Sequence, residues 1–248
     1  MSKSKKAARS AIIIVFLTLG SKFLGFIRET LIAAKFGAGI KTDTFFIAMT
    51  VTGLVTGLIS TAVKTTFVPV LSEVEAREGK EGKIAHTNNM INIVFFMAVV
   101  LAVLGWLGTP FLVRLVAKGF RGQQYILAVK LTRMGMPMLI FSGIVGAISG
   151  FLQSEERHTS TAAIGFPYNF VFIFYLLLLA TYFGIGGLMV TAVLGTISQL
   201  LIQLPEAKKT GYRYRFVLDL KDDYVKIELC QQIKFFNPWG FYLGNYHC

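Results

Sequence analysis

Six long apolar stretches, separated by short polar ones, dominate the pattern along this 248-residue chain. They cover approximately residues 11–34, 44–71, 89–116, 132–152, 161–183 and 186–204. A helix needs about 20 mostly apolar residues to cross the hydrocarbon core of a bilayer. Lipid offers no hydrogen-bond partners to the backbone, so stretches of this length predict helices. The pattern therefore predicts an all-α integral membrane protein, a bundle of about six transmembrane helices.

The composition supports this class. Hydrophobic residues make up 54% of the chain and charged residues only 15%, whereas a soluble domain carries about 25% charged residues. A net charge of +12 would suggest a nucleic-acid partner in a soluble protein. Here the basic residues lie mostly in short segments between apolar stretches, where they set orientation, so we predict membrane lipids and no nucleic acid as partners.

Basic residues between the stretches predict the orientation. One side of the membrane would hold twelve of them: Lys3, Lys5, Lys6, Arg9, Arg77, Lys80, Lys83, Arg157, Lys208, Lys209, Arg213 and Arg215. The other side would hold four, Lys35, Lys41, Lys118 and Arg121. The positive-inside rule then places both termini in the cytoplasm of a multi-pass protein.

The same pattern divides the chain into three regions: a cytoplasmic basic N-terminus at 1–10, the transmembrane bundle at 11–204, and a C-terminal region at 205–248. Within the last, Pro205–Lys226 is predicted to be an amphipathic segment at the membrane surface, followed by an atypical tail. Between spans, residues 73–89 and Glu155-Glu156 are predicted to be a loop and a solvated turn. The glycines of 184–187 predict a tight hairpin.

Ionisable residues interrupt the first span near its middle, in Ser21-Lys22-Phe23-Leu24-Gly25-Phe26-Ile27-Arg28-Glu29. A charge at that depth costs about 2.5–3.5 kcal/mol on insertion scales, so such residues usually face a cavity. At 100° per residue, Ser21 aligns with Arg28 and Lys22 with Glu29, with Gly25 between the two lines. One side of this helix is predicted to be polar, small and mainly cationic.

Two interpretations of this side are open. It could bind an anionic ligand, since a guanidinium group matches phosphate oxygens in a bidentate way. Alternatively, Arg28 and Glu29 could pair with neighbouring helices for structure. Asp43, at the start of the second span, is predicted to cap that helix, with pairing to a basic residue as the alternative.

No sequence motif for catalysis is present. His86, His158 and His247 do not form a metal-binding pattern, and the chain has no glycine-rich phosphate loop or nucleophile elbow. We therefore predict a non-enzymatic protein that needs no cofactor and no metal.

The first cluster is followed by further motifs: Ala33–Gly39, Thr42–Ala48, Phe67–Glu73, Arg133-Met134-x-x-Pro137, Gly150–Gln153 and Tyr212–Tyr214. Together they make the chain resemble the opening of the MurJ/MviN lipid II flippases of the MOP superfamily. That resemblance implies one half of a two-bundle transporter fold with alternating access to a central cationic cavity. It also implies a bacterial cytoplasmic membrane location and a lipid-linked diphosphate sugar substrate, the peptidoglycan precursor lipid II. Carried over by motif, Ser21, Lys22, Gly25, Arg28 and Glu29 would bind substrate, and Asp43 would belong to the outer side or a gate.

Three departures from the family pattern bear on the function. Lys22 stands where the family often has arginine, and Thr52-Gly53 and Thr56 stand where it often has Pro-Asn and a further arginine. The sequence also ends after the spans of the first bundle, which predicts an N-terminal half. The alternatives are a non-transporting fragment or accessory subunit, joined to a partner bundle or a homo-oligomer, and an exporter of another lipid-linked oligosaccharide.

Overall fold

The computed structural model describes residues 3–228, and describes side chains for residues 10–57 and 66–228. Within that part every regular element is helical, which confirms the predicted fold class. The elements are α1 (Lys3–Phe36), α2 (Ile40–Val116), α3 (Gly122–Gly135), α4 (Met138–Ser154), α5 (His158–Ala162), α6 (Gly165–Phe174), the π-helical turn η1 (Tyr175–Leu179) and α7 (Ala180–Lys209). The predicted atypical tail, from residue 229 on, lies outside the described residues.

Two glycines reverse the chain inside long helices. Gly79 in α2 has φ 72° and ψ −169°, and Gly184 in α7 has φ 58° and ψ −153°. A side chain is strained at positive φ, so glycine is the residue suited to both reversals. The reversal at Gly184 confirms the predicted hairpin. Counted between these breaks, the described chain forms six long helical rods.

Four helical segments have the length and apolar character of membrane spans: Ser10–Phe36, Thr66–Val116, Gly122–Ser154 and His158–Lys209. The two glycine reversals fall inside the second and the fourth of them. Pro137 separates α3 from α4, where the next amides bond to carbonyls three residues back instead of four. This kink is the one expected where a proline cannot donate a backbone hydrogen bond.

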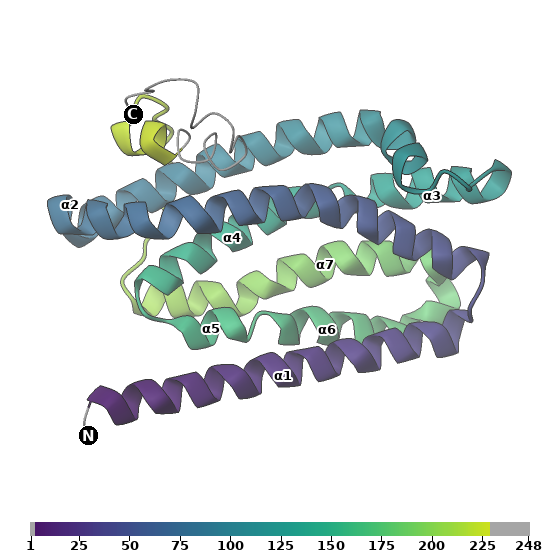
Figure 1. Ribbon diagram of the computed structural model, residues 1–248, viewed down its shortest axis with the longest axis horizontal. Helices are drawn as coiled ribbons and strands as arrows, with labels where there is room; N and C mark the ends of the chain where they lie inside the picture. Colours follow the sequence, from purple (N-terminus) through teal and green to yellow (C-terminus); the bar gives the residue numbers. More distant parts are fainter. Residues whose placement is uncertain (1–2, 229–248) are drawn as a thin grey trace, which may run out of the picture.

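The connections alternate between the two ends of the bundle (Figure 1). The start of α1, the Gly79 break, the α4–α5 turn and the end of α7 lie at one end. The α1–α2 junction, the α2–α3 loop and the Gly184 reversal lie at the other. This alternation agrees with the predicted grouping of the segments between spans on two sides of the membrane. The assignment of the first end to the cytoplasm stays a prediction.

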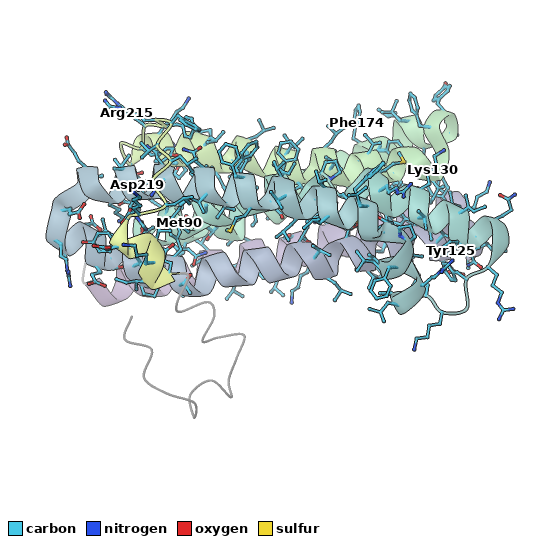
Figure 2. All side chains as sticks on the ribbon, turned by 90° about the horizontal axis from the view of Figure 1, so that it is seen from above. Met90, Tyr125, Lys130, Phe174, Arg215 and Asp219 are labelled. Atoms are coloured by element: carbon cyan, nitrogen blue, oxygen red, sulfur yellow. The ribbon has the colours of Figure 1, made fainter. Side chains whose placement is uncertain are left out.

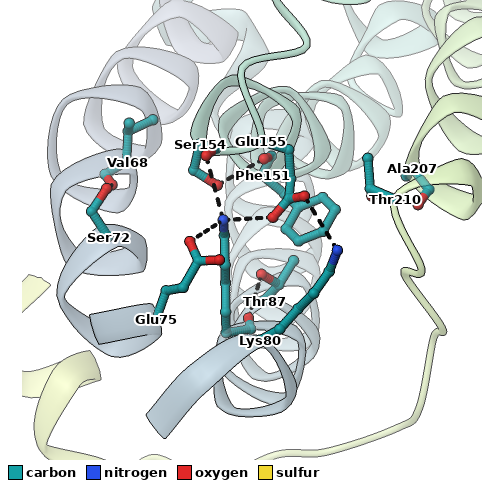
Figure 3. Close-up of polar contacts among 11 residues, drawn as sticks. Val68, Ser72, Glu75, Lys80, Thr87, Phe151, Ser154, Glu155, Ala207 and Thr210 are labelled. Carbon is teal, nitrogen blue, oxygen red and sulfur yellow. Dashed lines mark hydrogen bonds and ion pairs between the residues drawn. The ribbon is translucent and has the colours of Figure 1, made fainter. Parts of the chain in front are cut away.

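The predicted loop at 73–89 is wrong, because this segment is helical apart from Gly79. Lys83, expected in that loop, is fully buried. Its Nζ lies 2.6 Å from Glu155 Oε1 and 2.7 Å from Glu75 Oε2 (Figure 3 shows both carboxylates and the adjacent Lys80). The turn predicted at Glu155-Glu156 is present and Glu156 is exposed, but Glu155 is not solvated, because only 13% of its side chain is exposed. A buried cation needs such partners, and they tie the α2 reversal to the end of α4.

The segment predicted to be an amphipathic membrane-surface element is not one continuous helix, and its position at the membrane surface stays a prediction. α7 continues to Lys209, residues 211–222 are irregular, and residues 223–228 are helical. We call residues 211–228 the C-terminal strap. Three asparagines of α2 hold it by donating side-chain hydrogen bonds of 2.8–3.0 Å to main-chain carbonyls: Asn88 to Arg213, Asn89 to Asp219 and Asn92 to Val217. The strap is therefore fixed by polar contacts with α2.

The end of the strap encloses His86, which is buried on α2 beyond the apolar stretch 89–116. Its Nδ1 lies 3.2 Å from Asp222 Oδ2 and its Nε2 lies 3.1 Å from Glu228 Oε1. Burial would lower the pKa of His86, but hydrogen bonds and charge from Glu228 and Asp222 outweigh it and raise that pKa. Burial raises the pKa of Glu228 as well. A neutral imidazole can donate only one of these two hydrogen bonds, so both are donated only by the protonated ring.

Raising the pH should loosen the strap. Both pKa values are raised by folding, so closure takes up protons: its stabilisation is present below the ordinary pKa of histidine and lost as pH rises through the raised pKa of His86. We expect hydrogen-exchange protection factors of strap amides, corrected for intrinsic exchange, to fall several-fold between about pH 6 and about pH 9. His86→Gln, which does not titrate, should reduce this dependence to the part that Glu228 contributes. An equal fall in that variant would contradict the account.

Candidate functional site

The ionisable cluster of α1 presents two different sides. Ser21, Gly25 and Arg28 lie within about 60° of one another around the helix axis and face α6, which packs against α1. Lys22 is exposed, and Glu29 keeps 60% of its side chain exposed. The structure therefore joins three of the five predicted residues to a second helix and leaves the other two on an accessible side.

Arg28 is fixed by groups of α6 around its guanidinium. Nη1 donates a 3.0 Å hydrogen bond to Asn169 Oδ1, and Nη2 lies 3.3 Å from Glu29 Oε1. The guanidinium carbon lies 5.5 Å from the ring centre of Tyr168 and 5.2 Å from that of Phe172. Cation–π contacts of this length stabilise a partly desolvated arginine. Pairing with a neighbouring helix, one of the two interpretations of Arg28, is thus present.

Asn169 connects the two helices at this point. It is buried, and its Nδ2 donates to Ser21 O at 3.1 Å and to Gly165 O at 2.9 Å while its Oδ1 accepts from Arg28. One amide therefore satisfies a carbonyl on each helix and holds the guanidinium. A polar side chain in an apolar bundle is stable when all its groups are used in this way.

Close approach of the helices depends on Gly165. A Cβ atom at this position would overlap the Ser21 hydroxyl. Gly25 lies one turn further along α1, opposite the Asn169 amide, where a Cβ atom would lie 3.9 Å from Asn169 Oδ1, an ordinary contact distance. Gly165 on α6, facing Ser21 on α1, thus lets the two backbones approach closely enough for the Asn169 amide to reach Ser21 O.

The guanidinium keeps hydrogen-bonding capacity beyond these contacts. Arginine has five N–H donors in a planar fork. Among the residues that the structure describes, Asn169 and Glu29 are the acceptors for Arg28, through Nη1 and Nη2. The remaining N–H groups can bind an anion, and the arginine side chain is 21% exposed. The arrangement is thus a positioned cation with free donors, which suits phosphate oxygens.

Asp43 does not act as the predicted helix cap. Gly39 is the N-cap residue of α2, and no side chain caps it. Asp43 lies in the first turn, exposed, where its negative charge favours the positive end of the helix dipole. No described contact joins it to the Arg28 region, so an outer-side role stays a proposal.

Sequence reasoning missed the α6 half of the site: Tyr168, Asn169 and Phe172. A signal was present, because Asn169 is the single amide side chain in the apolar stretch 161–183. Such a residue in a span needs a polar partner, although the sequence does not say which. Within the part of the chain that the structure describes, no cluster of histidine, cysteine and carboxylate residues could hold a metal ion.

Comparison with known proteins adds a consistent set of relatives. The family model described as lipid II flippase MurJ matches residues 32–235. Lipid II flippase MurJ of Burkholderia cenocepacia is 31% identical over 206 residues, which cover 81% of this chain and 40% of the relative. Probable lipid II flippase MurJ of Buchnera aphidicola subsp. Acyrthosiphon pisum is 28% identical over 194 residues, 76% of this chain and 38% of the relative.

A solved structure of lipid II flippase MurJ in an inward closed conformation has the same fold. It superposes with a TM-score of 0.69 at 20% sequence identity, covering 90% of this chain and 47% of that one. This chain spans about 40% of the length of the curated relatives it matches. The family match begins at residue 32, so the cluster from Ser21 to Glu29 lies before it and Asp43 within it.

Replacing Asn169 should weaken the contact between α1 and α6. Asn169→Leu removes one acceptor and two donated hydrogen bonds, which leaves Ser21 O and Arg28 Nη1 without this partner. We expect a loss of about 1–3 kcal/mol in unfolding free energy in detergent. Thr50→Val is the matched control, since the exposed Thr50 hydroxyl bonds only to Phe46 O of its own helix. Equal stability of the two variants would contradict the role of Asn169.

Proposed function

The chain belongs to the lipid II flippase MurJ family, and from that premise we propose that it takes part in moving lipid II across the bacterial cytoplasmic membrane. Lipid II is the undecaprenyl-diphosphate-linked precursor of peptidoglycan. The chain contributes one helical bundle, residues 11–204, to a transporter that works by alternating access, with both termini cytoplasmic. It acts as a transport protein and not as an enzyme.

Arg28 carries this proposal. A guanidinium group inside an apolar bundle is costly, and such groups in membrane spans generally serve ions or substrates. This one is held by Asn169 and two aromatic rings, and it retains unused N–H donors. Substrate diphosphate oxygens are strong acceptors for a fixed guanidinium, which binds them in a bidentate way.

The other predicted residues have supporting roles in this proposal. Lys22 is exposed on the accessible side of the same helix and supplies a second positive charge to the diphosphate. Glu29 lies 3.3 Å from Arg28 Nη2 and limits the net positive charge. Ser21 O accepts a hydrogen bond from Asn169 Nδ2, Gly25 lies opposite the same amide, and Asp43, in the first turn of α2, lies on the proposed outer side.

A second candidate is an accessory bundle that binds a partner bundle or a second copy of itself; the residues matched here correspond to about 40% of the relative's length. Translocation of fluorescent lipid II by proteoliposomes containing only this chain would exclude that candidate. Binding of lipid II without translocation would support it.

Substitution of Arg28 should weaken substrate binding. In nanodiscs containing the chain, we expect Arg28→Gln to lower the affinity for lipid II at least about tenfold, since a hydrogen bond to a charged group contributes about 1.5–3 kcal/mol. The affinity of Arg28→Lys for lipid II should lie between those of the unchanged chain and Arg28→Gln, because lysine keeps the charge but lacks the planar fork. The control is Arg157→Gln, an exposed arginine that pairs with Glu206 at the end of the bundle.

Affinity for lipid II that is unchanged in Arg28→Gln would overturn the proposed site. Titration with an undecaprenyl-diphosphate-linked oligosaccharide that lacks the peptide tests the other substrate class. Thr56 bears on this choice, because the family resemblance implies a cation at this position, whereas the Thr56 hydroxyl donates a hydrogen bond to Thr52 O within its own helix. Equal affinity for the two lipids would show that the site reads the diphosphate alone.

A further inference from the structure

A groove lies between the second rod of α2 and α3, at the end of the bundle opposite the C-terminal strap. Its volume is about 580 Å³, and it is lined by apolar, aromatic and basic side chains: Trp106, Pro110, Tyr125, Ile126, Lys130 and Arg133. Figure 2 shows Tyr125 and Lys130 at one end of the molecule and Arg215 and Asp219 at the other. The flippase proposal uses none of these residues.

Helix geometry gives the groove a defined depth. The ionic cluster of Lys83 with Glu155, beside Ser154 O, marks one boundary of the apolar region. At 1.5 Å per residue, Trp106 lies about 35 Å from Lys83 along α2, and Arg133 about 30 Å from Ser154 along α3 and α4. The hydrocarbon core of a bilayer is about 30 Å thick. The groove therefore lies at the second membrane boundary, at the level of lipid headgroups.

Basic side chains at this boundary lack acidic partners. Arg133 stacks on Trp106, with its guanidinium carbon 4.5 Å from the ring centre, and its Nε donates a 3.3 Å hydrogen bond to Trp106 O. Lys130 is exposed one turn earlier on α3. Arg114 stacks on Tyr125 at 5.3 Å. The sequence contains no aspartate or glutamate between Lys83 and Ser154, and among the described residues no carboxylate pairs with these three cations.

The apolar wall of the groove faces outward. Ile126 is 62% exposed and Trp106 is 47% exposed. At the membrane boundary such side chains contact acyl chains, and tryptophan and tyrosine are typical of that level. A soluble anion would contact only the basic side chains and leave the apolar wall without a ligand contact. A lipid would contact the basic side chains with its headgroup and the apolar wall with an acyl chain.

We propose that this groove binds an anionic glycerophospholipid. One acyl chain lies along Trp106, Pro110 and Ile126, and the headgroup phosphate binds Lys130 and the free N–H groups of Arg133. The stack on Trp106 holds the Arg133 fork, and a positioned fork suits two phosphate oxygens. This site is separate from the Arg28 site, so its test does not depend on the flippase proposal.

Fluorescence of Trp106 can report occupancy directly. The second tryptophan of the sequence, Trp239, is replaced by phenylalanine, and the chain is placed in micelles with lipids that carry bromine on an acyl chain, a short-range quencher. We expect brominated phosphatidylglycerol to quench Trp106 at about a tenfold lower mole fraction than brominated phosphatidylcholine, because each basic residue near a headgroup favours an anionic lipid. Equal quenching by the two lipids would overturn the proposal without any further variant.

Variants separate the groove from general surface charge. Lys130→Gln with Arg133→Gln should reduce the preference for phosphatidylglycerol to about onefold. Lys118→Gln with Arg121→Gln removes the same charge from exposed positions in the neighbouring α2–α3 loop, and should keep the preference. If both double variants lose the preference for phosphatidylglycerol, the preference comes from overall charge, and the proposed binding site is contradicted. Excess inorganic phosphate should not displace the brominated lipid, and displacement would instead indicate a site for a free anion.

Discussion

Polar groups inside an apolar helical bundle must find their partners on other helices, because the hydrocarbon around them supplies none. This constraint explains the positions at which the helices of this protein are joined. Asn169 satisfies a carbonyl of α1, a carbonyl of α6 and the Arg28 guanidinium at once. Lys83 satisfies two carboxylates across the α2 reversal and α4. Apolar packing fills the space between these points, and the polar contacts set the register of the rods.

The apolar stretches predicted the helical rods because a membrane span requires a long run of apolar residues, which few other structural elements require. The Gly184 reversal was predictable for a local reason, a glycine-rich turn between two such stretches. The helix through 73–89 was not, because its charged residues indicate a solvated loop until Glu155 is known to lie beside Lys83. The C-terminal strap was missed similarly, since its partners are three asparagines more than a hundred residues away.

The candidate site was half predictable. Charge inside the first span identified Arg28, and helical periodicity placed Ser21 and Gly25 on its side. No sequence pattern pairs this side with α6 in preference to another helix, because that choice depends on how Gly165 lets the two backbones approach. The structure thereby changes the meaning of the cluster: Arg28 is both a structural contact and a cation with free donors. A substrate group that binds it also acts on the α1–α6 contact, which is a means of linking occupancy to helix movement.

The central claim is that Asn169 positions Arg28 for a diphosphate. A double-mutant cycle on lipid II affinity tests it most directly, with Arg28→Gln, Asn169→Leu and the two together, each measured in nanodiscs. If Asn169 acts through Arg28, the affinity of the double variant should equal that of Arg28→Gln alone. Fully additive losses would show that the two residues act independently and would contradict the account.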